Sequence, residues 1–148
     1  NPESSLAENQ ILAIALSCAY TTKNSDVVEF VLGQAEGKIS EEEINASKAA
    51  STIMAMNNIY YRFTHLVSDK DYLKMPAKLR MNIIGNPGVD KIDFELYSLA
   101  VSAINGCGLC IDSHVKQLIN SNIDKSTIAH TIRISSVINA TAQVLFIN

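Results

Sequence analysis

The longest periodic segment of this chain follows the sequence SEEE, and it limits the possible folds more than any other feature. From Ile44 to Phe63, apolar residues recur at intervals of three and four, which is the spacing of residues along one face of an α-helix. Ser40 and Glu43 have the spacing of a capping box, in which each side chain accepts a hydrogen bond from a backbone N–H group of the other residue. We therefore expect a long helix with Ser40 as its N-cap.

The remaining segments also have helical patterns. Asp90 is placed to cap a helix through FELYSLAVSAIN, and Asp124 is placed to cap the last long helix, which continues through Ile147. Gly106 and Gly108 are expected to break the first of these helices, just where two cysteines occur. Because no segment alternates apolar and polar residues as a strand does, the sequence predicts an all-α fold.

The length and composition suit one helical domain that spans residues 1–148. Hydrophobic residues make up 47% of the chain and charged residues 18%, which is an ordinary globular balance. The net charge of −3 argues against a nucleic-acid surface, and no apolar run is long enough to span a bilayer. Three cysteines and no visible signal peptide fit the reducing cytoplasm. Because the chain begins with Asn1 rather than Met, we expect the native start to lie upstream.

Two segments of the chain resemble each other. When NNIYYRFTH is placed over GCGLCIDSH, the histidines coincide, and Asn58 and Tyr61 fall at the positions of Cys107 and Cys110. One interpretation is an internal helical duplication, in which one copy keeps the chemistry and the other serves packing. The alternative is a chance match, because alanine-rich helices resemble one another.

The sequence CGLCIDSH brings together two thiols and an imidazole. In a helix, Cys107, Cys110 and His114 share one face, because they are separated by three and four residues. His114 is therefore able to reach the Cys110 thiol directly or through one water. Cys107 lies near the expected helix start, where free N–H groups lower a cysteine pKa from about 8.5 to roughly 3.5–7.5.

A thiolate needs a proton acceptor, and His114 can serve as one. Glu95 stands in an otherwise apolar helix and could stabilise the imidazolium, although a surface position is an equal alternative. Asp93 is nearer the capped helix start, and we expect it to be solvated. His65 and His130 have no cysteine close in sequence, so we expect structural or surface roles for them.

Several interpretations of the cysteine pair remain open at this point. A zinc site would use both thiols and His114, but the second pair of ligands that such sites normally have is missing. A thioredoxin-type module would place the motif in a βαβ setting. A helical dithiol catalyst, in which one thiolate attacks and the other resolves, uses every residue of the motif. Two chance cysteines in an inert helix are a further alternative. Cys18 stands alone in an apolar pattern and is expected to be a buried core residue.

The segment FELYSLAVSAINGCGLCIDSH resembles the signature of the alkylhydroperoxidase D family, within the carboxymuconolactone decarboxylase-like superfamily. The pattern of that family is a glutamate, then two cysteines three residues apart, then a histidine four residues later. Glu95, Cys107, Cys110 and His114 match it. The segments MAMNNIYYRF and LRMNIIGNPGV also resemble sequences of the family, so the resemblance covers most of the chain.

The resemblance implies an all-helical, trimeric antioxidant enzyme that reduces hydroperoxides through a Cys107–Cys110 disulfide cycle. It implies that Cys110 attacks and that Cys107 resolves. It also implies that Glu95 and His114 relay the proton. The helix-start argument alone instead favours Cys107 as the reactive thiol. No bound cofactor and no metal are expected. The implied external reductant is a dihydrolipoyl group on a dehydrogenase-complex protein. The implied partner is a peroxiredoxin, alkyl hydroperoxide reductase C.

Leu109 is the one departure from the family pattern, because well-studied relatives carry a histidine immediately before the second cysteine. Without that histidine, direct peroxidase activity could be weaker. The alternative function is a thiol–disulfide adaptor between a lipoyl reductant and a peroxiredoxin. A non-redox enzyme of the decarboxylase branch is a third hypothesis, but that branch lacks the cysteine pair.

Overall fold

The computed structural model describes residues 5–148, and helices dominate this part of the chain. In order along the chain the elements are α1 (Glu8–Thr22), α2 (Ser25–Ala35), α3 (Glu41–Leu66), the 3-10 helix η1 (Lys70–Lys74), α4 (Asn82–Gly85), α5 (Lys91–Asn105), α6 (Gly108–Asn120) and α7 (Lys125–Ile147). No strand occurs between residues 5 and 148, so the predicted all-α class is confirmed. Within the same range, no helix is both long and apolar enough to cross a membrane.

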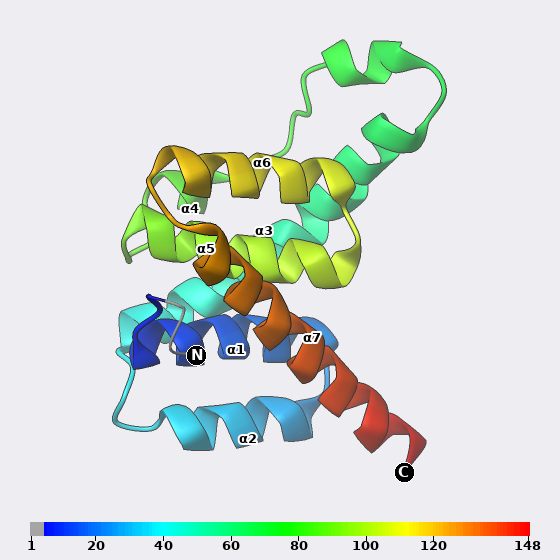
Figure 1. Cartoon of the computed structure of the whole chain (residues 1–148). Coiled ribbons are helices and arrows are strands. Elements are labelled where there is room, and N and C mark those ends of the chain that lie inside the picture. Colours follow the sequence, from blue (N-terminus) through cyan, green and yellow to red (C-terminus); the bar gives the residue numbers. More distant parts are fainter. Residues whose placement is uncertain (1–4) are drawn as a thin grey trace.

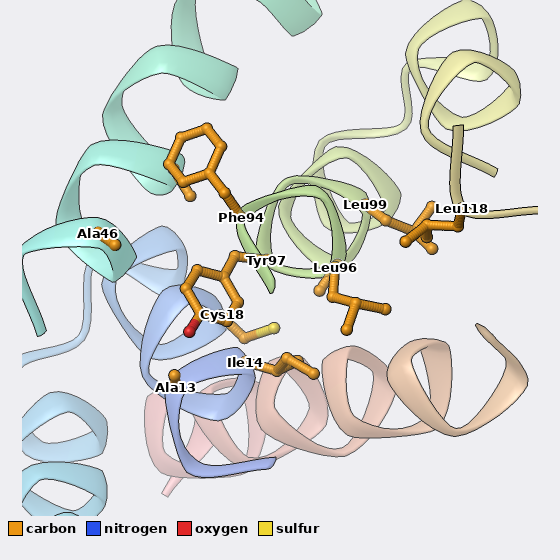
Figure 2. Packing of buried hydrophobic residues seen from close by; sticks show 11 residues of the cluster. Ala13, Ile14, Cys18, Ala46, Phe94, Leu96, Tyr97, Leu99 and Leu118 are labelled. Atoms are coloured by element: carbon orange, nitrogen blue, oxygen red, sulfur yellow. The ribbon is translucent and has the colours of Figure 1, made fainter. Parts of the chain in front are cut away.

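Helix α5 forms the centre of the fold and packs against α1, α3, α6 and α7 (Figure 1). Its side chains are buried on nearly every side from Phe94 to Ser102, as expected for a helix that is apolar around its circumference. Tyr97 and Leu96 meet Ile14 of α1 in the main core (Figure 2). A second, smaller apolar cluster joins α1 to α2. Its buried members are Leu16, Ala19, Val27 and Val31.

The predicted helix starts are confirmed. The Ser40 hydroxyl accepts from the Glu43 N–H group at 3.1 Å, and the Glu43 carboxylate accepts from the Ser40 N–H group at 3.0 Å. The Asp90 carboxylate accepts from the Ile92 N–H group, and the Asp124 carboxylate accepts from the Thr127 N–H group. These caps set where α3, α5 and α7 begin, and therefore which of their faces meet the core.

The chain turns between α5 and α6 at Gly106 alone. Gly106 has a φ of 73°, a left-handed conformation that costs glycine little, and its N–H group bonds to the Ser102 and Ala103 carbonyls. Gly108 is already the first residue of α6 and does not have a positive φ. The expectation that both glycines break the helix was therefore wrong for Gly108.

The segment proposed as a second copy of the cysteine motif has a different backbone. Helix α3 continues without interruption past Asn58 and Tyr61, whereas Gly106 divides the matching segment into two helices. The duplication therefore stays a prediction. The two segments nevertheless lie together in space, because α3 packs against both α5 and α6.

Candidate active site

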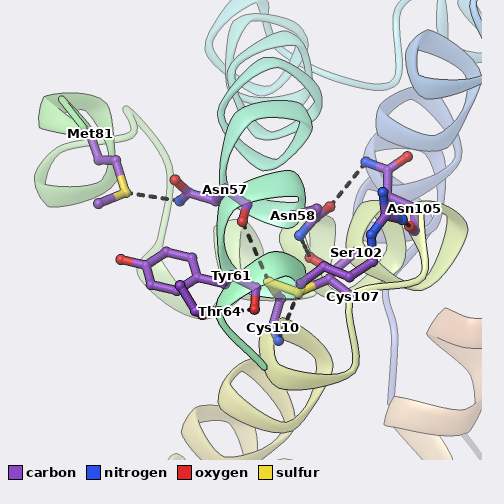
Figure 3. The surroundings of a disulfide bond; sticks show 10 residues. Asn57, Asn58, Tyr61, Thr64, Met81, Ser102, Asn105, Cys107 and Cys110 are labelled. Atoms are coloured by element: carbon purple, nitrogen blue, oxygen red, sulfur yellow. Dashed lines mark hydrogen bonds between the residues drawn. A yellow bond between two sulfur atoms is a disulfide. The ribbon is translucent and has the colours of Figure 1, made fainter. Parts of the chain in front are cut away.

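Cys107 and Cys110 form a disulfide at the start of α6, with their Cα atoms 5.3 Å apart (Figure 3). Cys107 is the N-cap of α6, and its sulfur accepts from the Cys110 N–H group at 3.2 Å. Cys107 is fully buried, whereas Cys110 keeps 7% of its surface exposed. Cys18 is free and fully buried in the core, and burial raises its pKa to about 12. The pairing and the buried Cys18 agree with the sequence-based expectation.

A hydrogen-bond network centred on the buried amide of Asn58 connects α3 to the turn that carries the cysteines. The Asn58 side chain donates from Nδ2 to Ser102 Oγ at 2.9 Å and accepts at Oδ1 from Asn105 Nδ2 at 3.0 Å (Figure 3). Arg62 Nη1 donates to the Asn105 carbonyl at 2.7 Å. The Cys107 N–H group donates to the Ser102 carbonyl at 3.2 Å, so the same α5 residue supports both the amide network and the disulfide turn.

Glu95 and His114 form a pair between α5 and α6. The distance between Glu95 Oε1 and His114 Nδ1 is 2.5 Å, and the side chains are 27% and 12% exposed. Of the two alternatives for Glu95, the structure therefore supports the partner of the histidine over a solvated surface residue. A carboxylate at Nδ1 favours the tautomer that has its proton there, which leaves Nε2 as the acceptor. Nε2 is buried and makes no hydrogen bond within the described residues.

These groups line one cavity of about 390 Å³ between α3, α5 and α6. Its wall contains Met54, Asn57, Tyr61, Ile84, Glu95, Leu109, Cys110, Ser113 and His114. The surface of the cavity is largely apolar, and its wall carries the disulfide-bonded sulfur of Cys110, one imidazole and one carboxylate. Cys107 is not part of the wall. Among residues 5–148 the structure gives His114 no direct hydrogen bond to Cys110, although both contribute to the cavity.

The cavity contains residues that sequence reasoning missed. Asn57 lies in the segment that the sequence assigned to packing, yet its backbone carbonyl oxygen is 3.9 Å from Cys110 Sγ. Its side-chain Nδ2 donates to Met81 Sδ at 2.9 Å (Figure 3). Ile84 of α4 also reaches the cavity. The cysteine motif carries no local signal for these contacts, because they depend on how α3 and α4 pack against α6.

The other polar candidates lie outside the cavity. His65 is exposed, and His130 is partly buried on α7, where burial lowers its pKa. Asp93 was expected to be solvated, but it is half-buried and accepts from Gln10 Nε2 at 2.7 Å. Burial raises the pKa of Asp93, which corrects that expectation. Across residues 5–148, no three His, Cys, Asp or Glu side chains gather in a way that could hold a metal ion.

Comparisons with known proteins show the family of this chain. The model of the carboxymuconolactone decarboxylase family matches residues 70–146. A Coxiella burnetii protein named alkyl hydroperoxide reductase AhpD is 56% identical over 147 residues, which are 99% of this chain and 83% of the relative. Proteins of the same name from Hyphomonas neptunium and Brucella anthropi are 52% and 50% identical, over 97% and 95% of this chain and 79% and 80% of their own. The chain therefore belongs to the AhpD group of the carboxymuconolactone decarboxylase family.

Proposed function

We propose that this chain is an antioxidant dithiol peroxidase, which reduces hydroperoxides through a cycle of Cys107–Cys110 disulfide formation and reduction. The observation that carries the proposal is the disulfide at the wall of a cavity that also contains the Glu95–His114 pair. A cysteine pair needs an exposed attacking sulfur, a nearby resolving sulfur and a group that moves a proton. The Cys110 sulfur and the Glu95–His114 pair lie at the cavity wall, and the Cys107 sulfur is bonded to Cys110 behind it.

Cys110 is proposed as the attacking residue, because it lines the cavity and Cys107 is enclosed. In the reduced protein, His114 Nε2 takes the Cys110 proton, and the Glu95 carboxylate stabilises the imidazolium through Nδ1. The Cys110 thiolate attacks the terminal oxygen of the hydroperoxide. An S–O bond forms as the O–O bond breaks, and two electrons pass from sulfur to the peroxide. The departing alkoxide takes the proton from His114 and leaves as an alcohol.

Cys107 then resolves the Cys110 sulfenic acid. An S–S bond forms between the two residues while the S–O bond breaks, and the hydroxide leaves as water with the Cys107 proton. Because Cys107 is only one helical turn from Cys110, closure needs little movement of the backbone. An external dithiol returns two electrons and two protons. We propose a dihydrolipoyl group on a dehydrogenase-complex protein for this step, since the AhpD resemblance implies it.

The second candidate function is a thiol–disulfide adaptor with little peroxidase activity of its own. Leu109 favours it, because this apolar side chain lies at the cavity wall, at the position where the family resemblance implies a histidine. In that case Cys110 would exchange with a peroxiredoxin, alkyl hydroperoxide reductase C, rather than with a hydroperoxide. We also propose, from the family resemblance, that the chain assembles as a homotrimer.

One coupled assay separates the two functions. Lipoamide and its NADH-dependent reductase supply electrons, and NADH loss is followed after hydroperoxide is added, with and without a peroxiredoxin. The peroxidase consumes NADH without the peroxiredoxin, and Cys110→Ser abolishes that consumption. Consumption only in the presence of the peroxiredoxin identifies the adaptor. If neither mixture exceeds the Cys110→Ser background, both functions are contradicted.

A further inference from the structure

Within residues 5–148, one residue of the cavity wall, Asn57, has a buried amide oxygen without a hydrogen-bond partner. Asn57 is only 6% exposed, and its Oδ1 makes no hydrogen bond within the described part of the chain. The amide orientation follows from the other end of the group, since Nδ2 donates to Met81 Sδ and a thioether cannot donate to an oxygen. A buried acceptor without a partner destabilises a folded protein, so its presence calls for a physical reason.

The neighbouring residue shows that this is not a general property of the helix. Asn58 is also buried, and both ends of its amide are paired, with Ser102 Oγ and Asn105 Nδ2. The Asn58 side chain points toward the disulfide turn and that of Asn57 toward Met81 (Figure 3). Of the two, only Asn57 is a residue of the cavity wall. Asn58, which has a structural role, thus has hydrogen-bond partners at both ends of its amide. Asn57, in the cavity wall, has an amide oxygen that can still accept one.

A second residue of the cavity wall, His114, also has a buried polar atom, Nε2, that makes no hydrogen bond to residues 5–148. Asn57 also lies beside the proposed nucleophile, because its backbone carbonyl oxygen is 3.9 Å from Cys110 Sγ. The cavity therefore offers a nucleophilic sulfur, a proton carrier and a hydrogen-bond acceptor. A hydroperoxide has one group for each of these. Its terminal oxygen is the electrophile for the sulfur, its departing alkoxide accepts a proton, and its single O–H group donates a hydrogen bond.

We propose that Asn57 Oδ1 accepts the hydrogen bond of the hydroperoxide O–H group and thereby orients the terminal oxygen toward Cys110 Sγ. This inference rests on the proposed peroxidase function and assigns a substrate-binding residue to it. The O–H bond stays intact during attack, while the O–O bond breaks and the alkoxide takes its proton from His114. Asn57 therefore keeps the same partner in the Cys110 sulfenic acid, and it neither gains nor loses a proton.

The test compares two electrophiles that react with the reduced chain. Tert-butyl hydroperoxide carries the O–H donor. Methyl methanethiosulfonate is attacked by the same thiolate, which displaces methanesulfinate, and it carries neither an O–H nor an N–H donor. Asn57→Leu removes the amide at nearly constant volume, and Asn57→Ala is the second variant. With either variant, the rate constant for the hydroperoxide should fall about tenfold, the value of one hydrogen bond, while that for the thiosulfonate stays within about twofold.

Melting temperature supplies a second readout. Asn57→Leu should melt no lower than the wild type, because it removes an unpaired acceptor, whereas the control Asn58→Leu should melt lower, because it deprives Ser102 and Asn105 of partners. Equal rate losses with both electrophiles, no loss with either, or loss of folding in both Asn57 variants would each overturn the inference. A wild-type chain that reacts with the thiosulfonate but not with the hydroperoxide overturns the proposed function, and this inference with it. A reactive wild type with unaffected Asn57 variants overturns the inference alone.

Discussion

At the scale of single residues, the three cysteines of this chain differ in burial and in location. Cys110 borders the cavity, Cys107 is enclosed directly behind it, and Cys18 is enclosed in the core with its pKa raised to about 12. Because only a thiolate attacks, the raised pKa keeps Cys18 out of the chemistry at neutral pH. Position in the fold therefore assigns different roles to chemically identical groups.

The Glu95–His114 pair gives the first prediction. His114→Ala should lower the rate of hydroperoxide-driven disulfide formation at pH 7 by about 10²–10⁴, the usual value of a general acid–base group. Glu95→Gln should have a milder effect, because it removes only the charge that holds the imidazolium. Both deficits should shrink between about pH 7 and pH 10, since hydroxide then generates the thiolate without a relay. Stopped-flow measurement over this range tests the expectation.

The control for this experiment is His65→Ala, because His65 is exposed and outside the cavity. It should match the wild type at every pH. Melting temperatures should be similar in all variants. If the loss of rate in His114→Ala were the same at every pH, His114 would have a packing role and no role in proton transfer.

Asp93 gives a prediction on pH and stability. Burial raises its folded-state pKa above the unfolded value of about 3.9, so the folded chain binds the proton more tightly. Stability from this group therefore falls as pH rises through the window between the two values, and it stays lower at neutral pH. Asp93→Asn keeps an acceptor for Gln10 and should raise the unfolding free energy at pH 7 by less than about 1 kcal/mol, because the side chain is partly solvated.

Urea unfolding of Asp93→Asn and the wild type between about pH 3 and pH 7 measures this difference. It should vanish at the acid end, where Asp93 is neutral in both states. The control Glu29→Gln replaces an exposed carboxylate of α2 and should show no such trend. A variant that is less stable than the wild type at pH 7 would show that the charge contributes favourably.

At the scale of elements, each wall of the cavity is one helical face. Met54, Asn57 and Tyr61 are three and four residues apart on α3, and Cys110 and His114 are four apart on α6. Sequence periodicity predicted both helices. It did not predict that the face of α3 with Asn57 turns toward the cysteines, because an apolar helical face looks the same whether it covers a core or a cavity.

Local signals explain which parts of the fold were predictable. Ser40, Asp90 and Asp124 act on backbone groups within three residues, so their sequence positions are sufficient. The Glu95–His114 pair joins two helices, and reasoning from the residues left Glu95 open until the family resemblance was considered. The half-burial of Asp93 depends on Gln10, which is far away in sequence. Contacts of this kind cannot be found without the packed structure.

The connection between α5 and α6 gives a prediction at this scale. Gly106→Ala should lower the unfolding free energy by about 1–2 kcal/mol, the cost of a left-handed conformation for a residue with a Cβ atom. Gly108→Ala is the matched control, because an added Cβ meets open space at both positions and only Gly106 has a positive φ. Gly108→Ala should therefore be neutral or stabilising. Urea unfolding compares the two, and equal effects would contradict the role assigned to Gly106.

At the scale of the whole molecule, large apolar side chains remain at the surface of the single chain. Those more than half exposed include Phe30, Ile59, Leu66, Val137 and Phe146. Exposed apolar area of this kind often marks a surface that another protein covers. Together with the family resemblance, it leads us to predict a closed homotrimer of 16.1 kDa chains. Light scattering coupled to size exclusion measures the mass, and a monomer at micromolar concentration would contradict the prediction.

The central claim is that hydroperoxide oxidises Cys110 first and that Cys107 then closes the disulfide. The most direct measurement mixes the reduced chain with one equivalent of hydroperoxide, blocks free thiols and maps the peptides by mass spectrometry. The account predicts a Cys107–Cys110 disulfide with Cys18 blocked as a free thiol, a trapped Cys110 sulfenic acid in Cys107→Ser, and no reaction in Cys110→Ser. A Cys110→Ser variant that consumes hydroperoxide at the wild-type rate, or a major disulfide that contains Cys18, would contradict it.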